Sequence, residues 1–350
     1  MTDDHPPISK KKKLLAIVTM SFSFFLFSMS IEAEALHQMQ TFFYGTETAI
    51  RVELMKYKNE EAKQKDYEEV TIVAFGDMML GRYVRTLMER NGHDYPFEHI
   101  PELVGSMLPE NLDEPDFLFA NLEGPISDNT YVNPGTAMRF NFKPDVTEML
   151  NKYGFNLLSL ANNHAYDMGE KGAFQTRQYL QAAKIHYFGD AQSVKEETTW
   201  TTTIKDTTIT FVGLNDTVYD HLDYEAATAR IAEVEAESDF TIVSIHWGNE
   251  YWDTPTDEQV NGAHAFVDAG ADVIIGHHPH IIASSEWYHS RPIYYSLGNF
   301  IFDQYFQQNV QEGLGLTITL KKPADETKLP VIKVETTEFD ILASQPQVRE

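Results

Sequence analysis

The sequence VTIVAFGD at residues 70–77 is an apolar run, rich in β-branched residues, that stops at Gly76 and Asp77. A short apolar run bounded by turn-forming residues predicts a buried strand. Four further runs have the same form, and each of them also stops at a polar cluster. Those clusters are Asn121-Leu122-Glu123-Gly124, Ala161-Asn162-Asn163-His164, His246-Trp247-Gly248 and Gly276-His277-His278-Pro279-His280.

Helical patterns lie between these apolar runs. Residues 170–184 and 257–269 carry apolar side chains at helical spacings, and the second segment has an acidic first turn. Strands that alternate with helices predict an α/β fold. Near the C-terminus, residues 316–320 and 331–334 are two further apolar runs, which predict a hairpin.

The N-terminus has a different composition. Four lysines at residues 10–13 precede an uncharged, apolar stretch over residues 14–31. Such a stretch is long enough to span a bilayer, and preceding lysines favour a cytoplasmic amino end. We therefore expect a single-pass cell-membrane protein whose C-terminal domain is extracytoplasmic. The alternative is a signal peptide cleaved near Ala33-Glu34-Ala35.

These observations divide the chain into five parts. We expect a cytoplasmic tail over residues 1–13 and a transmembrane signal-anchor over residues 14–31. Residues 32–69, rich in Glu and Lys towards their end, predict an extracytoplasmic stalk. The globular domain is predicted over residues 70–343, and residues 344–350 are expected to form a frayed tail.

Composition limits the function classes. The hydrophobic fraction of 42% is enough for a substantial core. The formal net charge is −26, and an acidic surface repels phosphate backbones, so a nucleic-acid partner is not expected. The sequence contains no cysteine, which excludes disulfides, thiolate metal sites and a cysteine nucleophile.

The polar clusters predict one shared site. Ligands of open α/β sheets bind beyond the carboxyl ends of the strands, where all five clusters are expected to lie. Their Asp, Glu, Asn and His side chains are ligands for a divalent metal, such as manganese, iron or zinc. Taken alone, Asp77 is more typical of a turn or cap, and a single histidine is more typical of an ordinary partly buried environment. The interpretation depends on the coincidence of all five clusters.

Two metals about 3.5–4 Å apart would favour hydrolysis, with a bridging hydroxide as the nucleophile. Glu123, with its two carboxylate oxygens, is the natural bridge between them. The sequence contains no Gly-x-Ser-x-Gly elbow, no phosphate-binding loop and no dinucleotide fingerprint. ATP-driven ligation by this chain is therefore not expected.

Taken together and in order, the motifs over residues 70–305 resemble those of the CapA/PgsA family of bacterial capsule and poly-γ-glutamate synthesis proteins. The motifs are Gly76-Asp77-Met78-Met79-Leu80-Gly81-Arg82, Asn121-Leu122-Glu123-Gly124-Pro125, Ala161-Asn162-Asn163-His164-Ala165-Tyr166-Asp167-Met168-Gly169, His246-Trp247-Gly248-Asn249-Glu250-Tyr251, Gly276-His277-His278-Pro279-His280 and Ser296-Leu297-Gly298-Asn299-Phe300. The family is related to calcineurin-like metallophosphoesterases. The resemblance therefore implies a metallophosphatase-like, four-layer α/β/β/α sandwich after the N-terminal transmembrane helix.

The resemblance also implies a role for each candidate residue. Asp77 and His280 would bind a first metal, and Glu123 would bridge to a second. The ligands of the second metal would be Asn163, His246 and His278. His164 would be the catalytic acid that assists the leaving group. Metallophosphoesterases usually carry a histidine where this chain has Met79, so the first site lacks a ligand. Two alternatives follow: occupancy by a single metal, or a site without catalytic activity.

Arg82 is a candidate for contacting an anionic substrate, although a salt bridge at a helix start is the commoner role for such a residue. The expected function is a membrane-anchored subunit for synthesis or export of poly-γ-glutamate or a similar polyanionic capsule polymer, working with other polymer-synthesis subunits. One alternative is an extracytoplasmic metallophosphoesterase of envelope phosphoesters. The other is a noncatalytic scaffold that binds polymer or partner subunits.

Overall fold

The structure is a computed structural model that describes residues 67–130, 138–191, 194, 198–217, 221–323 and 330–349. The predicted cytoplasmic tail, the transmembrane signal-anchor at residues 14–31 and nearly all of the stalk lie outside the described residues. Within the described part, no helix has the length and apolar character needed to cross a membrane.

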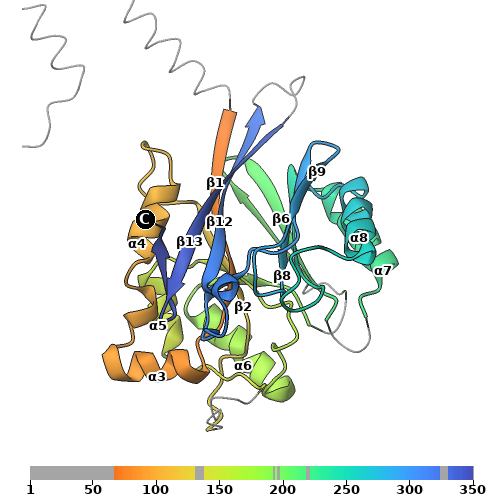
Figure 1. Cartoon of the computed structure of the whole chain (residues 1–350). Coiled ribbons are helices and arrows are strands. Elements are labelled where there is room, and N and C mark those ends of the chain that lie inside the picture. Colours follow the sequence, from red (N-terminus) through yellow and green to blue (C-terminus); the bar gives the residue numbers. More distant parts are fainter. Residues whose placement is uncertain are drawn as a thin grey trace, which may run out of the picture. The chain divides into compact units, whose positions relative to one another are not determined.

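Two β-sheets form the centre of the domain (Figure 1). In spatial order, the described strands of the first sheet are β14 (Gln345–Val348), β13 (Val331–Leu342), β12 (Glu312–Pro323), β1 (Tyr67–Met78), β2 (Phe117–Leu122), β3 (Leu157–Ser159) and β4 (His186–Phe188), with β11 (Asn299–Ile301) also paired to β1. Those of the second sheet are β5 (Thr199–Ile204), β6 (Thr207–Asn215), β7 (Phe240–His246), β8 (Val273–His277), β10 (Arg291–Tyr294) and β9 (Ser285–Tyr288).

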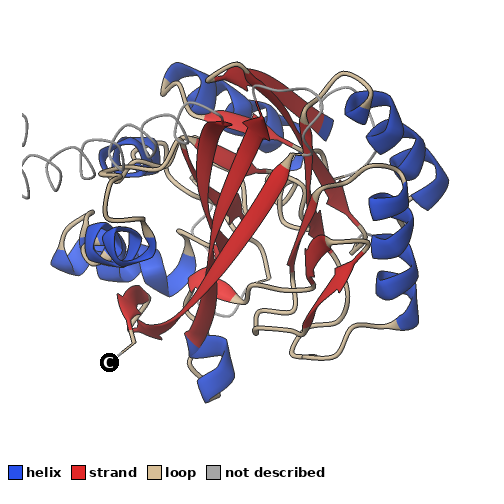
Figure 2. Ribbon diagram, turned by 90° about the horizontal axis from the view of Figure 1, so that it is seen from above, coloured by secondary structure: helices blue, strands red, loops and turns tan. Residues whose placement is uncertain are grey.

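Helices cover the outer faces of both sheets (Figure 2). Those on the first sheet are α3 (Arg82–Asn91), α4 (Ile100–Met107), α5 (Val146–Lys152) and α6 (Gly169–Ala182). Those on the second sheet are α7 (Tyr224–Glu235) and α8 (Asp257–Asp268). Two short 3-10 helices, η1 (Tyr95–Phe97) and η3 (Gln308–Gln311), lie in connections.

The alternation of side chains along β1 shows why the layers form. Val73 and Phe75 point to the helices on the outer face, where they belong to one hydrophobic core. Ile72 and Ala74 point the other way, into a core shared with the second sheet. Both faces of the strand are buried, as a nearly continuous apolar run requires. A third core lies between the second sheet and helices α7 and α8, so the order of layers is helices, sheet, sheet, helices.

The predicted mixed α/β fold is confirmed, and the long periodic segments are located correctly. The helix expected over residues 170–184 is α6, and the one expected over residues 257–269 is α8. Helix α8 begins with a capping box, in which Thr256 and Gln259 exchange side-chain to backbone hydrogen bonds. The predicted C-terminal hairpin is β12 and β13, and it is longer than the two apolar runs alone indicate.

The domain begins before residue 70. Strand β1 starts at Tyr67, and its first residues pair with the end of β12. Glu69 lies opposite Lys321 in this register, and their side chains form an ion pair at 2.5 Å. The sequence prediction placed these acidic residues in the stalk because it did not anticipate their basic partners on β12.

The prediction of a frayed tail over residues 344–350 is wrong. Strand β14 pairs with β13 through a two-residue turn at Ala343 and Ser344, which both have positive φ. Such a turn usually contains Asn-Gly or a similar pair, so Ala-Ser gave no turn signal. The side chain of Gln345 donates a hydrogen bond of 2.6 Å to the carbonyl oxygen of Tyr95, which ties β14 to η1.

Phe339 on β13 tests how much this C-terminal hairpin contributes to stability. Its ring is fully buried and packs edge-on against Phe75 and Phe300, at 5.7 and 5.8 Å between ring centroids. We expect Phe339→Ala to lower the free energy of unfolding by about 3–5 kcal/mol, the usual cost of truncating a buried phenylalanine. Denaturant unfolding measures this change. Exposed Thr336 on the same strand is the matched control, and an equal loss from Thr336→Ala would contradict the assignment.

Candidate metal centre

The candidate site lies where strands of both sheets end. Asp77 is at the end of β1 and Glu123 directly follows β2, while His246 ends β7. In the register of the first sheet, Asp77 lies opposite Asn121, and in the second sheet His246 lies opposite His277. The structure therefore brings the five polar clusters to one place, as the sequence indicated.

Glycines allow the strand ends to approach other backbone segments. A Cβ atom at Gly76 would lie 1.9 Å from the carbonyl oxygen of Gly298, and one at Gly276 would lie 2.1 Å from that of Tyr295. Neither position accepts a side chain without displacing the neighbouring backbone. The first approach lies beside the start of β11, which pairs with β1. Both approaches fix the chain immediately before a residue of a polar cluster, Asp77 or His277.

Asp77 connects the two halves of the site. Its fully buried carboxylate accepts one hydrogen bond from the side chain of Asn121 at 2.8 Å and one from the backbone N–H of His278 at 3.1 Å. His280 Nδ1 lies 3.4 Å from the same carboxylate. Burial alone would raise the pKa of Asp77, but the hydrogen bond with His280 and the nearby imidazoles hold it well below its ordinary value.

Glu123 is a fully buried carboxylate with no hydrogen-bond donor among the described residues for either of its oxygens. His164 Nε2 and His280 Nε2 face it at 3.7 and 3.8 Å. Burial raises the pKa of Glu123 to about 7. A buried carboxylate without donors is costly unless a cation compensates it, so this residue fits a metal site.

A second group of ligand atoms lies beside the first. His246 Nε2 is 2.9 Å from Asn163 Oδ1 and 3.2 Å from His278 Nδ1. Burial lowers the pKa of both histidines, that of His278 to about 3, so both rings are neutral and offer lone pairs. This is the donor set predicted for a second metal, and its role as a ligand set remains a prediction.

His280 is oriented by a residue that the sequence prediction did not assign. Its Nδ1 lies 3.0 Å from Asn299 Oδ1, which accepts a hydrogen bond from that nitrogen. The other ring nitrogen, Nε2, then faces Glu123. Hydrogen bonds of this kind fix the tautomer of metal-binding histidines. Burial alone would lower the pKa of His280, but the carboxylates of Glu123 and Asp77 raise it to about 9.

His164 has the surroundings expected of a proton donor. Its Nδ1 lies 2.8 Å from the carboxylate of Asp167, and its ring stacks on Phe140 at 4.0 Å between centroids. Asp167 thus fixes the ring so that Nε2 points toward Glu123. The role of His164 as the catalytic acid remains a prediction.

The side chain of Arg82 is occupied by a carboxylate. Its guanidinium contacts both oxygens of Asp303, at 2.8 and 3.1 Å, and Asp303 also accepts the backbone N–H of Tyr83 at the start of α3. This is the salt bridge at a helix start that the sequence left open as the alternative. The predicted contact with substrate therefore requires that Arg82 share or release Asp303.

Two triads of potential metal ligands appear among the described residues. One is Asp77, Glu123 and His280, and the other is Glu250, His278 and His280; within each, one donor atom per residue lies within 4.8 Å of the others. Glu250 lies in the motif at residues 246–251, for which the sequence predicts only His246 as a ligand. Its signal was its position four residues after His246, which becomes meaningful only once the turn places it beside His278.

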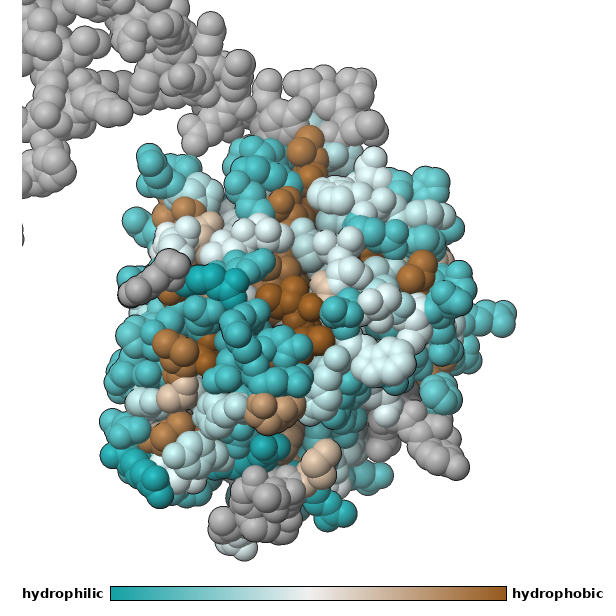
Figure 3. Space-filling view, in the orientation of Figure 1, coloured by the Kyte–Doolittle hydropathy of each residue, from teal (hydrophilic) through white to brown (hydrophobic). Residues whose placement is uncertain are grey.

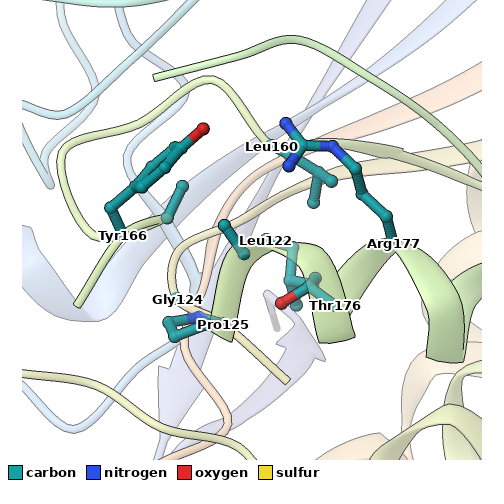
Figure 4. A pocket seen from close by; sticks show the side chains of 9 residues that line it. Leu122, Gly124, Pro125, Leu160, Tyr166, Thr176 and Arg177 are labelled. Carbon is teal, nitrogen blue, oxygen red and sulfur yellow. The ribbon is translucent and has the colours of Figure 1, made fainter. Parts of the chain in front are cut away.

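The small cavity behind the site is not a substrate pocket (Figure 4). Its volume of about 10 Å³ is at the lower limit for one water molecule. Tyr166 and Arg177 at its edge both donate hydrogen bonds to Asp190, at 3.2 and 2.9 Å. These contacts hold the turn that carries Asn163 and His164 against helix α6.

Comparison with known proteins adds an independent result. The family described as "Bacterial capsule synthesis protein PGA_cap" matches residues 71–304. The chain belongs to this family. It is 30% identical over 263 residues to "Capsule biosynthesis protein CapA" of Bacillus anthracis, a match that covers 69% of this chain and 62% of that protein. It is also 30% identical over 265 residues to "PGA biosynthesis protein CapA" of Bacillus subtilis, covering 71% and 67% of the two chains.

Among solved structures, one described as a novel phosphatase from Mycoplasma pneumoniae matches 81% of this capsule-family chain and 95% of its own chain. Its sequence identity is 14% and its TM-score is 0.49.

The protonation of His280 gives a test of the metal centre. Between about pH 7 and 9, the metal-free protein should lose stability as pH rises, because a group with a raised folded-state pKa loses its stabilising contribution as pH passes through that value. Affinity for Mn²⁺ should rise over the same window, because the ion must displace that proton. Thermal unfolding with EDTA and with MnCl₂ across this range measures both trends.

Glu123→Gln is the matched variant for this experiment, because Glu123 is the main charge that raises the pKa of His280. The variant should show a flatter pH dependence without metal and little stabilisation by Mn²⁺. An unchanged pH dependence and unchanged Mn²⁺ stabilisation would contradict the site.

Proposed function

We propose that the chain is a membrane-anchored, extracytoplasmic subunit for synthesis or export of poly-γ-glutamate or a similar anionic capsule polymer. In this proposal its domain has a metallophosphatase-like fold and carries a metal-dependent, hydrolase-like site. Family membership and the names of the two Bacillus relatives support the capsule role. No nucleotide-binding motif is present in the sequence, so a separate ligase would make the polymer.

One observation carries the catalytic part of the proposal: the buried Glu123 carboxylate faces His164 and His280 and has no donor of its own among the described residues. Asp77, Glu123 and His280, with Asn163, His246 and His278 beside them, would hold one or two divalent ions. A bound ion would supply a Lewis acid and an activated water. His164, oriented by Asp167, would deliver a proton to the leaving group.

The surface fits a protein that handles a polyanion without retaining it. The face shown in Figure 3 is mostly hydrophilic, with an apolar patch near its middle. The net charge of −26 repels an anionic polymer away from the site. In this proposal, a bound cation is therefore the part of the protein that attracts a carboxylate or phosphate group of the polymer.

Polymer production in cells tests the catalytic role. In a strain that lacks this gene, complementation with Glu123→Gln or His278→Ala should lower capsule polymer at least tenfold relative to the unaltered chain, because each change removes a predicted metal ligand. Glu258→Gln, at an exposed position on α8, is the control and should restore wild-type yield. Full polymer yield from the two site variants would leave the noncatalytic scaffold as the function.

Assays on the purified chain separate the enzymatic alternatives. With Mn²⁺ present, cleavage of γ-glutamyl substrates would support action on the polymer. Cleavage of phosphodiesters alone would favour the envelope phosphoesterase.

Membrane attachment is a separate prediction. The unaltered chain should sediment with the membrane fraction, and its domain should be digested by protease added outside intact protoplasts. Removal of residues 14–31 should leave the domain in the cytoplasm, because the only predicted export signal is lost. A protease-resistant domain in intact protoplasts carrying the unaltered chain would contradict the extracytoplasmic assignment.

A further inference from the structure

The turn that follows β7 is fixed against the segment that carries His278 and His280. The backbone N–H of Trp247 donates to the carbonyl oxygen of His277 at 3.1 Å, and that of Tyr251 donates to the carbonyl oxygen of Pro279 at 2.8 Å. Tyr251 has a φ of 68°, which is uncommon for a residue with a bulky side chain. The turn therefore holds an unfavourable backbone conformation that keeps Glu250 beside the two histidines.

Glu250 shares His280 with the first triad. A carboxylate oxygen of Glu250 and one ring nitrogen each from His278 and His280 lie within 4.8 Å of one another. His280 also lies within this distance of donor atoms of Asp77 and Glu123. Its imidazole is thus flanked by carboxylates from β1, from the residue after β2 and from the turn after β7.

Met79 stands where the resemblance implies a histidine ligand, and its side chain is not available to a metal. Met79 is fully buried in the hydrophobic core between the first sheet and its helices. Its sulfur accepts the backbone N–H of Gly81 at 3.1 Å. The thioether is therefore engaged in the loop after β1 and leaves the first metal position with a ligand missing.

Among the described residues, the carboxylates around His280 have no basic side chain beside them other than histidine. In the part of the chain that the structure describes, no Lys or Arg lies within 4.0 Å of the carboxylates of Asp77, Glu123 or Glu250, whereas histidines do approach the first two. Asp77 and Glu123 are fully buried, whereas Glu250 is half-buried. A buried carboxylate without a basic partner is costly, and a bound divalent ion would remove this cost.

We propose that Glu250 is a metal ligand, whose carboxylate binds a divalent ion together with His278 and His280. The inference rests on the metal-binding part of the proposed function. The donors for this ion would be one carboxylate and two imidazoles. Carboxylates suit manganese and imidazoles suit zinc, so loss of the carboxylate should weaken Mn²⁺ binding more than Zn²⁺ binding.

Metal binding by the purified full-length chain tests the assignment. The apo protein, prepared with EDTA, is titrated with MnCl₂ and separately with ZnCl₂ by calorimetry, and bound Mn²⁺ is followed by electron paramagnetic resonance. Glu250→Gln should weaken Mn²⁺ binding at least tenfold, since even outer-shell partners of metal ligands are worth about 10–100-fold. Its affinity for Zn²⁺ should change less than that for Mn²⁺.

Two further variants make the result specific. Glu258→Gln removes an exposed carboxylate from α8 and should bind Mn²⁺ like the unaltered chain. Glu250→His restores a donor of the softer type, so it should recover binding but with a preference shifted toward Zn²⁺. All variants should unfold at the same temperature in EDTA, which shows that the fold is retained.

Wild-type Mn²⁺ affinity and stoichiometry in Glu250→Gln would overturn the role of Glu250 and leave the proposed metal centre intact. Failure of the unaltered chain to bind either ion would overturn both. Loss of Mn²⁺ binding in Glu250→Gln with normal capsule polymer in cells would support the ligand assignment while contradicting the catalytic function.

Discussion

The Asp77 carboxylate is the interaction on which the rest of the site depends. It lies at the end of a central strand of the first sheet, yet one of its hydrogen bonds comes from a loop of the second sheet. It therefore fixes the relative position of the two sheet edges. The glycine before it is required for the same reason, because only a residue without a side chain lets Gly298 approach so closely.

Around this carboxylate the protein gathers negative charge and neutral imidazoles in a buried space. Burial raises the pKa of Glu123 and lowers that of His278, while His280 is driven in the opposite direction by the carboxylates beside it. Groups with such divergent pKa values are typical of functional sites. Burying these carboxylates costs free energy without a bound cation, and a bound cation would offset that cost.

The sequence predicted the elements with strong periodicity and the coincidence of polar clusters at strand ends. It did not predict features whose cause lies elsewhere in the chain. Glu69 lies in a strand opposite Lys321, and the turn at Ala343 and Ser344 lacks the Asn-Gly or similar pair that is typical of such turns. Likewise, the proximity of Glu250 to His278 depends on a backbone hydrogen bond from Tyr251 to Pro279, which no spacing in the sequence shows.

The position of β1 has a consequence for biosynthesis. This strand is the first of the described domain, yet one of its long neighbours, β12, is formed by residues 312–323. At translation rates of about 5–20 residues per second, β1 waits on the order of ten seconds or more for that partner. Until then an apolar strand exposes an open hydrogen-bonding edge, which is a template for aggregation. Pairing with β12, once residues 312–323 are synthesised, closes this edge of β1.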